Sequence, residues 1–350
     1  MTRGWQITLG DDGPRAELVE LDNDELTPQS AEAPETIGDV QVAVTWSGLN
    51  YKDALAFAGN TGVVRRTPLV PGVDVVGIVE ASSNPRWSAG DRVLLNGAGA
   101  GETRHGGLAQ RAVLDGDTLV ATPAAFTDAQ AAGIGTAGFT AMLAVLALER
   151  HGVAPEPGAE VLVTGASGGL GSFAIALLAR AGYTVAAATG RPQNADRLRA
   201  LGAASIVDRS ELDRSSRALE SQRWAGVIDS VGGQSLATAI AQLRHGAAAA
   251  SCGNAASATL STTVMPFILR GVALLGVNST LTPLALREQA WARLARDLDP
   301  AVVDSIAHAV PLDQARNRAA DVLEGHVPGR LSVAVSESAA SMTDRVKENP

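Results

Sequence analysis

The chain has 350 residues, a length that usually forms two domains rather than one. Hydrophobic residues make up 46% of it, so it can bury a large core without a disulfide or metal staple. With 28 Lys and Arg against 37 Asp and Glu, the formal net charge is −9. This charge argues against a general nucleic-acid or anionic-membrane binder and leaves room for a local basic pocket.

The single cysteine, Cys252, excludes a disulfide framework, a four-thiolate zinc site and an iron–sulfur cluster. The first residues, Met1 to Gln6, lack the apolar run and small-residue cleavage site of a signal peptide. No window holds about 18 uninterrupted apolar residues, so no membrane span is predicted. We therefore expect a cytoplasmic protein.

Residues 1–125 are predicted to be rich in β-strands. Residues 40–44 alternate between polar and apolar side chains, as a half-buried strand does. Further short strands are expected at 73–79, 92–95 and 108–114, and glycine-rich turns separate them. Many short strands joined by such turns are typical of a partly closed β-barrel.

From residue 126 on, the pattern changes to helices and then to alternating strands and helices. Residues 127–130 resemble a helix start, and apolar residues recur at helical spacing from 139 to 150. The later alternation predicts βαβ units and a parallel sheet. The expected strands are 161–163, 184–188, 206–207, 227–228, 247–251, 274–277 and 331–335, and the expected helices are 170–181, 195–201, 236–243 and 286–298.

These strand and helix patterns predict four segments. Residues 1–125 form the β-rich domain and residues 126–280 the parallel-sheet domain. Residues 281–335 form a C-terminal segment, and the polar residues 336–350 form a flexible tail. The expected fold class is α/β, with a β-barrel domain beside a doubly wound parallel sheet.

The strongest motif is a glycine triplet between a predicted strand and a predicted helix. Gly165, Gly168 and Gly171 give the spacing GxxGxxG rather than GxGxxG. Small residues here let the backbone approach a pyrophosphate, and the helix start offers free N–H groups. The alternative is a tight turn that binds nothing. The motif predicts dinucleotide contacts at Ser167, Gly168, Gly169 and Leu170.

The end of the next strand indicates which dinucleotide to expect. An NAD site places Asp or Glu there to bind the ribose 2′-OH. This chain has Thr189, Gly190 and Arg191 instead. Because an arginine can bind a 2′-phosphate through two parallel hydrogen bonds, NADPH is favoured over NADH. The alternative for Arg191 is a solvated surface charge. Arg209, after the following strand, either adds a second charge or is a solvated surface residue.

Short sequence motifs spread over roughly residues 5–335 resemble those of the medium-chain dehydrogenase/reductase superfamily. Within it they resemble the zinc-free quinone oxidoreductase-like branch and its acrylyl-CoA reductases. The resemblance implies an N-terminal GroES-like β-barrel, a Rossmann domain, a return of residues 281–335 to the first domain, and a homodimer. The motifs that carry this resemblance are Ser47–Ala54, Pro71–Asp74, Gly106–Ala109, Gly135–Leu143, Thr164–Ser172, Trp224–Asp229 and Thr262–Arg270.

The resemblance also implies a reaction. This is the NADPH-dependent reduction of an α,β-unsaturated acyl-CoA, acryloyl-CoA to propanoyl-CoA, by hydride transfer to the β-carbon without a metal. The alternatives are an NADPH:quinone oxidoreductase acting on small quinones or enones, and a cofactor-binding protein without catalysis. In the zinc-dependent relatives a Cys, a His and a Cys bind the metal. Asn50, Val73 and a glycine near Gly133 stand at the matching positions, so no metal is predicted.

The resemblance assigns the catalytic roles to Tyr51 and Asn50. Tyr51 would position the nicotinamide or donate a proton, and Asn50 would hydrogen-bond the substrate carbonyl. The alternatives are an aromatic ring packed at the domain cleft and an asparagine that caps a turn. Asp53 is expected to be structural. Further cofactor contacts are expected at Asn254, Ser279 and Arg330, and candidate donors for the CoA phosphates are Arg65, Arg66 and Arg104, where a solvated charge is the alternative.

Overall fold

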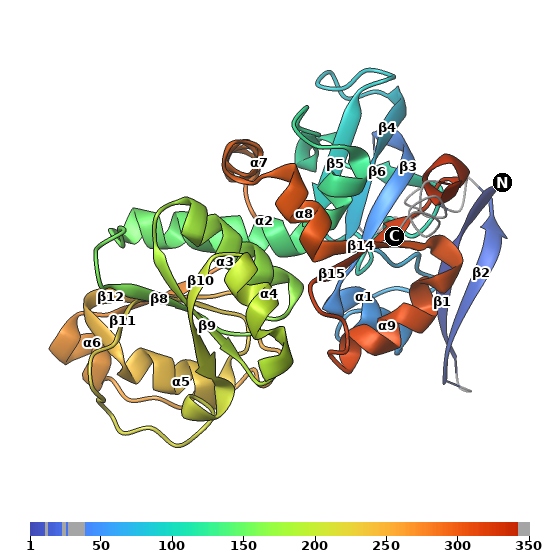
Figure 1. Ribbon diagram of the computed structural model, residues 1–350. Helices are drawn as coiled ribbons and strands as arrows, with labels where there is room; N and C mark the ends of the chain where they lie inside the picture. Colours follow the sequence, from blue (N-terminus) through green and yellow to red (C-terminus); the bar gives the residue numbers. More distant parts are fainter. Residues whose placement is uncertain (11–12, 23–25, 27–38, 342–350) are drawn as a thin grey trace. The chain divides into compact units, whose positions relative to one another are not determined.

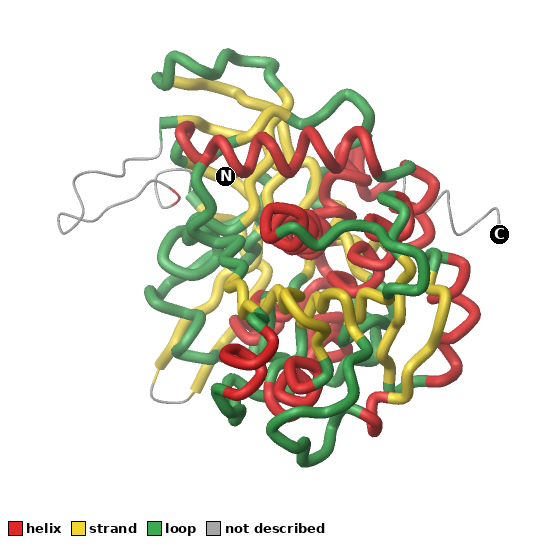
Figure 2. Tube along the Cα trace, turned by 90° about the vertical axis from the view of Figure 1, so that its left-hand side faces the viewer, coloured by secondary structure: helices red, strands yellow, loops and turns green. Residues whose placement is uncertain are grey.

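The computed structural model describes residues 1–10, 13–22, 26 and 39–341 (Figure 1). Figure 2 shows the same residues by secondary structure. The chain divides into two compact units. The first comprises Met1–Thr136, Ser279–Ala295 and Val303–Pro350, and the second comprises Ala137–Asn278 and Arg296–Val302.

The first unit is built on a seven-stranded sheet with the order β14-β15-β3-β4-β5-β7, in which β6 also pairs with β3. All pairs are antiparallel except β14 with β15. Val40, Val42 and Val44 alternate with more exposed residues and are buried in the core, which explains why this segment forms a strand. The strands are β3 (Val40–Leu49), β4 (Asp74–Ser82), β5 (Arg92–Asn96), β6 (Arg111–Leu114), β7 (Val120–Ala121), β14 (Ala307–Pro311) and β15 (Arg330–Ala334).

A hairpin and a helix of the first unit were not predicted from the sequence. β1 (Thr2–Gly10) and β2 (Gly13–Leu21) form an antiparallel hairpin. Helix α1 (Tyr51–Phe57) packs against α9 (Ala315–Leu323). Because α1 follows β3 directly, the polar residues at its start lie at the end of a core strand.

Three helices pass from one unit to the other: α2 (Asp128–His151), α7 (Leu284–Asp297) and α8 (Pro300–Ile306). By length and composition α2 could cross a membrane, but 83% of its most apolar window is buried inside the protein, as in a core helix. Its backbone leaves the helical region at Gly135, where φ is 42°.

The second unit is a six-stranded parallel sheet with the order β10-β9-β8-β11-β12-β13. Helices α3 (Gly169–Arg180) and α4 (Ala195–Ala200) cover one face, and α5 (Gly233–Ala241) and α6 (Met265–Arg270) cover the other (Figure 1). The predicted doubly wound sheet is confirmed, and its strand order reverses between β8 and β11, where such sheets bind ligands. The strands are β8 (Glu160–Val163), β9 (Thr184–Thr189), β10 (Ala203–Asp208), β11 (Trp224–Asp229), β12 (Leu243–Ser251) and β13 (Ala273–Gly276).

The structure describes only the first part of the predicted flexible tail. Residues 337–341 form a helical turn, and the Ala339 side chain is buried. The rest of the predicted tail, residues 342–350, lies outside the described residues.

Candidate functional site

The glycine loop of the second unit joins β8 to α3. Gly168 is the N-cap of α3, so the first N–H groups of the helix have no partner within it. A Cβ on Gly171 would lie 2.4 Å from the carbonyl oxygen of Gly165, so a larger residue would push the helix away from the loop. The free N–H groups and the positive end of the helix dipole make this loop a site for an anion.

The carboxyl end of β9 is tied to this loop by side chains. Ser167 Oγ and Thr189 Oγ1 are 2.7 Å apart and share a hydrogen bond, and both residues are buried. The backbone N–H of Arg191 donates to Thr189 Oγ1 at 3.0 Å. The structure therefore brings together the predicted residues of the loop and of the strand end.

Two guanidinium groups lie at this strand end. A Cβ on Gly190 would be 3.2 Å from the guanidinium carbon of Arg209, so the Arg209 side chain lies against Gly190. Arg209 is exposed and Arg191 is half-buried. Among the described residues, neither guanidinium has a hydrogen bond or a salt bridge. Two cations beside a strand end without an acid fit a 2′-phosphate better than a free 2′-OH.

Sequence reasoning missed Arg197, a residue of α4. Its Nη2 donates to the carbonyl oxygen of Ser167 at 2.8 Å, and its Nη1 donates to Ser172 Oγ at 3.1 Å. These partners precede it by 30 and 25 residues, so no local pattern reveals the contact.

Two further predicted cofactor contacts, Asn254 and Ser279, belong to different units. Asn254 is exposed after β12, 3.5 Å from where a Cβ of Gly232 would stand. Ser279 begins a segment of the first unit that the buried Arg287 fixes to β5, since Arg287 donates to the carbonyl oxygens of Asn96 at 2.6 Å and Thr280 at 2.9 Å. The cofactor roles of Asn254 and Ser279 remain predictions.

In the first unit, both the oxygen and the nitrogen of the Asn50 side-chain amide form hydrogen bonds. Its Oδ1 accepts a hydrogen bond from Arg330 Nη1 at 2.6 Å. Its Nδ2 donates to Asp53 Oδ2 at 3.1 Å and to Asp74 Oδ2 at 2.8 Å. Asn50 therefore holds three charged side chains in place and is the N-cap of α1, in line with the capping role given as its alternative; its contact with the substrate carbonyl stays a prediction.

Tyr51 is the exposed member of this group. The residue is 45% exposed, and its hydroxyl has no hydrogen-bond partner in the described part of the chain. The neighbouring Lys52 instead binds Glu102 Oε1 at 2.7 Å and Thr280 Oγ1 at 3.2 Å. Tyr51 thus offers a free hydroxyl at the start of α1.

Asp53 is a buried structural carboxylate. Its Oδ2 accepts from the N–H of Asn50 at 2.7 Å, and its Oδ1 accepts from the N–H groups of Gly72 at 3.1 Å and Val73 at 2.9 Å. Burial raises the pKa of Asp53 to about 6; the charge of Asp74 also raises it, and these hydrogen bonds oppose the change. Asp53 fixes the start of α1 to the turn before β4.

Arg330 is buried and forms an ion pair with Asp74, which is also buried. Asp74 Oδ1 accepts from Asn96 Nδ2 at 2.7 Å and from Thr136 N–H at 2.9 Å. A Cβ on Gly135 would lie 2.2 Å from Arg330 Nη2, which explains a glycine at the interruption of α2. The sequence predicted that Arg330 contacts the cofactor. In the structure the charge of its guanidinium is already balanced by Asp74.

The positions that match the zinc ligands do not form a donor set. A Cβ on Gly133 would lie 2.8 Å from the Ala307 methyl group, and Val73 has no donor atom. Within the described ranges, no three His, Cys, Asp or Glu residues form a group that could hold a metal ion. These side chains do not fit a catalytic zinc ion.

Two candidate donors for the CoA phosphates, and Arg270 at the end of the Thr262–Arg270 motif, have structural partners within the protein. Arg104 pairs with Asp115 at 3.7 Å, and Arg65 Nε donates to the carbonyl oxygen of Gly62 at 3.0 Å. Arg270 Nη1 donates to the carbonyl oxygens of Ala241 and Leu243 at 2.9 and 3.0 Å. Burial raises the pKa of the Cys252 thiol, which keeps it protonated and unreactive.

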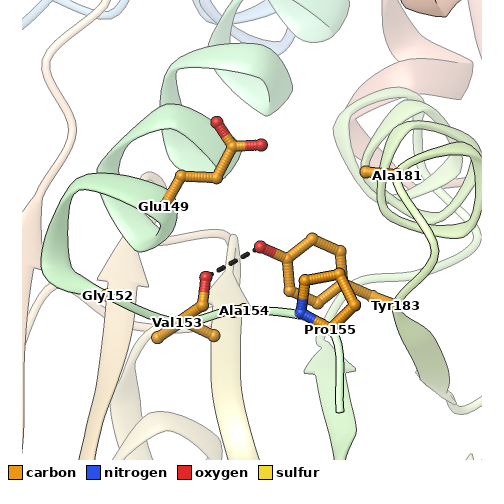
Figure 3. Close-up of a pocket in the computed structure, with 7 residues that line it drawn as sticks. All are labelled: Glu149, Gly152, Val153, Ala154, Pro155, Ala181 and Tyr183. Carbon is orange, nitrogen blue, oxygen red and sulfur yellow. Dashed lines mark hydrogen bonds between the residues drawn. The ribbon is translucent and has the colours of Figure 1, made fainter.

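A cavity of about 290 Å³ lies elsewhere in the second unit (Figure 3). Tyr183, which precedes β9, donates its hydroxyl to the carbonyl oxygen of Val153 at 2.8 Å beside the cavity. None of the predicted site residues lines it. The lining residues are Glu149, Gly152, Val153, Ala154, Pro155, Ala181 and Tyr183.

Comparison with protein families gives two matches. Residues 36–147 match the alcohol dehydrogenase GroES-like domain. Residues 169–296 match the zinc-binding dehydrogenase family.

Individual relatives are similar over most of their length. The acrylyl-CoA reductase AcuI of Ruegeria pomeroyi is 48% identical over 86% of this chain and 91% of its own. The probable acrylyl-CoA reductase AcuI of Escherichia coli is 49% identical over 85% of this chain and 92% of its own. The crystal structure of the yhdH oxidoreductase from Salmonella enterica in complex with NADP superimposes with a TM-score of 0.91, at 46% identity over 96% of this chain and 100% of that one.

Proposed function

Because this chain belongs to the medium-chain dehydrogenase/reductase superfamily and, within it, to the acrylyl-CoA reductases, we propose that it reduces an α,β-unsaturated acyl-CoA with NADPH. The proposed reaction converts acryloyl-CoA to propanoyl-CoA. The observation that carries the proposal is the arrangement at the end of β9. There Ser167 and Thr189 are hydrogen-bonded, Arg209 lies against Gly190, and no acid stands where an NAD site needs one.

The residues of the second unit fit the phosphate groups of NADPH. The N–H groups at the start of α3 would bind the pyrophosphate, and Arg191 and Arg209 would bind the 2′-phosphate. Gly168 and Gly169 have no side chain to block the approach of a phosphate, and the backbone N–H of Leu170, in the first turn of α3, is proposed as a further contact. Asn254, Ser279 and Arg330 are proposed as further contacts of the cofactor.

When bound, NADPH supplies the hydride that adds to the β-carbon of the unsaturated thioester. The α-carbon then needs a proton, and the thioester oxygen needs a hydrogen-bond donor while negative charge develops on it. Tyr51 carries the free hydroxyl that can meet either need. Asn50 and Asp53 hold the first turn of α1, so that the Tyr51 ring is presented from a fixed backbone.

Initial rates of NADPH oxidation test this proposal. Purified protein receives acryloyl-CoA, crotonyl-CoA or a benzoquinone in parallel, with NADH in place of NADPH as the control. Acryloyl-CoA reduced fastest, with NADPH only, is the expected result. Fast benzoquinone reduction with little acryloyl-CoA turnover would instead identify a quinone oxidoreductase. Tight NADPH binding without turnover of any acceptor would identify a binding protein.

We further propose a cytoplasmic homodimer that uses the edge of the parallel sheet. β13 is the last strand of that sheet, and Leu274 on it is 39% exposed. Val264, Ile268 and Leu269, in and beside α6, are also exposed apolar residues. An open strand edge beside apolar side chains favours a second copy of the chain as its partner. Light scattering of an Ile268→Glu variant should report monomers; a dimer unchanged by the substitution would contradict this interface.

A further inference from the structure

Arg197 has an unusual environment for a cation. Its side chain is half-buried and reaches from α4 to the glycine loop, and burial lowers its pKa. Its Nε is buried without a hydrogen-bond partner. Among the described residues no carboxylate forms a salt bridge with it. A charge that is partly removed from water is stabilised by an anion, and this half-buried guanidinium could therefore gain from an anionic ligand at the loop.

The two hydrogen bonds of Arg197 reach both sides of the loop. Nη2 donates to the carbonyl oxygen of Ser167, inside the loop, at 2.8 Å. Nη1 donates to Ser172 Oγ, in the first turn of α3, at 3.1 Å. One planar guanidinium therefore fixes the loop relative to the helix N-terminus, which a single-point donor cannot do. It also adds a positive charge to the loop through its contact with Ser167.

We propose that Arg197 is a positioning residue for the dinucleotide pyrophosphate. It holds the glycine loop in its anion-binding shape and supplies positive potential there. This inference rests on the proposed function, because it takes a phosphate group of NADPH as the anionic ligand. The pyrophosphate is common to NADPH and NADH, so Arg197 should support both dinucleotides equally. Arg191, at the strand end, should instead distinguish them.

Dissociation constants of the full-length protein for NADPH and for NADH test the proposal. Arg197→Met keeps the apolar stem and removes the charge and both hydrogen bonds. We expect it to raise both constants by roughly tenfold or more, as the loss of a charged hydrogen-bond donor does. Arg199→Ala is the matched control, because Arg199 lies on the same helix with a side chain 57% exposed and paired only with Asp196. It should leave both constants unchanged.

The salt dependence of binding separates the charge of Arg197 from a purely structural role. Added salt screens attraction between ions, so the Met variant should lose part of the wild-type dependence on ionic strength. Arg197→Lys keeps the charge without the two-point fork, and should restore that dependence while binding more weakly than wild type. An unchanged melting temperature shows that the variants are folded.

The outcomes are distinct. Equal losses of affinity for the two dinucleotides, with reduced salt dependence in the Met variant only, support the proposal. A loss confined to NADPH, no loss at all, or a Met variant with wild-type salt dependence would overturn it. If the wild-type protein binds neither dinucleotide, the proposed function itself fails; if wild type binds and the Met variant binds equally well, only the role of Arg197 fails.

Discussion

The carboxylate of Asp74 and the guanidinium of Arg330 form an ion pair whose side chains are 0% and 3% exposed. The partners stand 256 residues apart in the chain. Asn50 bonds both of them, and Asn96 and Thr136 bond Asp74. One network therefore joins the start of α1, the end of β5, the bend in α2 and the start of β15.

Breaking this ion pair should strongly destabilise the first unit. Arg330→Met leaves the Asp74 carboxylate buried without its cation, and Asp74→Asn leaves the Arg330 cation without its anion. Each should lower the free energy of unfolding by about 3–5 kcal/mol. The double variant should lose less than the sum of the two, because neither charge is then unpaired. Denaturant unfolding measures all three, and additive losses would show that the pair does not act as a unit.

Tyr51→Phe should lower kcat for acryloyl-CoA by about 100-fold, the contribution of a positioned proton donor. The ring and its packing remain, so the dissociation constant for NADPH should change by less than about twofold. The chain has only one other tyrosine, Tyr183, which provides the control. Tyr183→Phe removes a hydrogen bond to Val153 and should cost stability without affecting turnover. A Tyr51→Phe enzyme with wild-type kcat would exclude a chemical role for the hydroxyl.

Arg191→Ala should raise KM for NADPH by roughly 10- to 100-fold, since a charged hydrogen bond to the 2′-phosphate is lost. KM for NADH, which has no 2′-phosphate, should stay within about twofold. Steady-state kinetics with each cofactor measure the two values, and the exposed Arg217→Ala serves as the control. Equal effects on NADPH and NADH would contradict the 2′-phosphate assignment.

Asp53 should make stability fall as pH rises from about 4 to about 6. Its pKa is raised from 3.8 to about 6 in the folded protein, so the folded state binds the proton more tightly than the unfolded state does. Its contribution is therefore most favourable below pH 4 and is lost as pH rises to 6, by about 3 kcal/mol. Asp53→Asn removes this titration. The difference in unfolding free energy between wild type and variant should change across that range and stay constant above it; a constant difference from pH 4 to pH 7 would contradict the raised pKa.

The parallel-sheet unit was predictable because its signals are local. Gly165, Gly168 and Gly171 stand within seven residues between a strand and a helix, and the apolar runs on either side are short and regular. The same local pattern predicted a strand that ends beside Thr189, Gly190 and Arg191, and β9 ends at Thr189 in the structure. The hairpin of β1 and β2 was missed although its first strand carries the pattern of a half-buried strand, with Trp5, Ile7 and Leu9 alternating with polar residues.

The polar contacts were not predictable because they join distant segments. Arg197 is one of two arginines on a short helix, and only the folded chain shows that it bonds Ser167 while Arg199 pairs with Asp196. Likewise, the sequence left Asn50 as either a substrate contact or a cap, and its hydrogen bonds to Arg330, Asp53 and Asp74 could not be predicted. Burial and partner choice, rather than residue type, determine these roles.

The central claim is hydride transfer from NADPH to the β-carbon of an unsaturated acyl-CoA. It is tested most directly by incubating the protein with acryloyl-CoA and NADPH deuterated at C4 of the nicotinamide, using each of the two deuterated faces in turn. Mass spectrometry and NMR of the product then locate the label. We expect propanoyl-CoA with one deuterium at C3 from one of the two faces, and with a solvent-derived hydrogen at C2. NADPH left unoxidised, or deuterium found at any position other than C3, would contradict it.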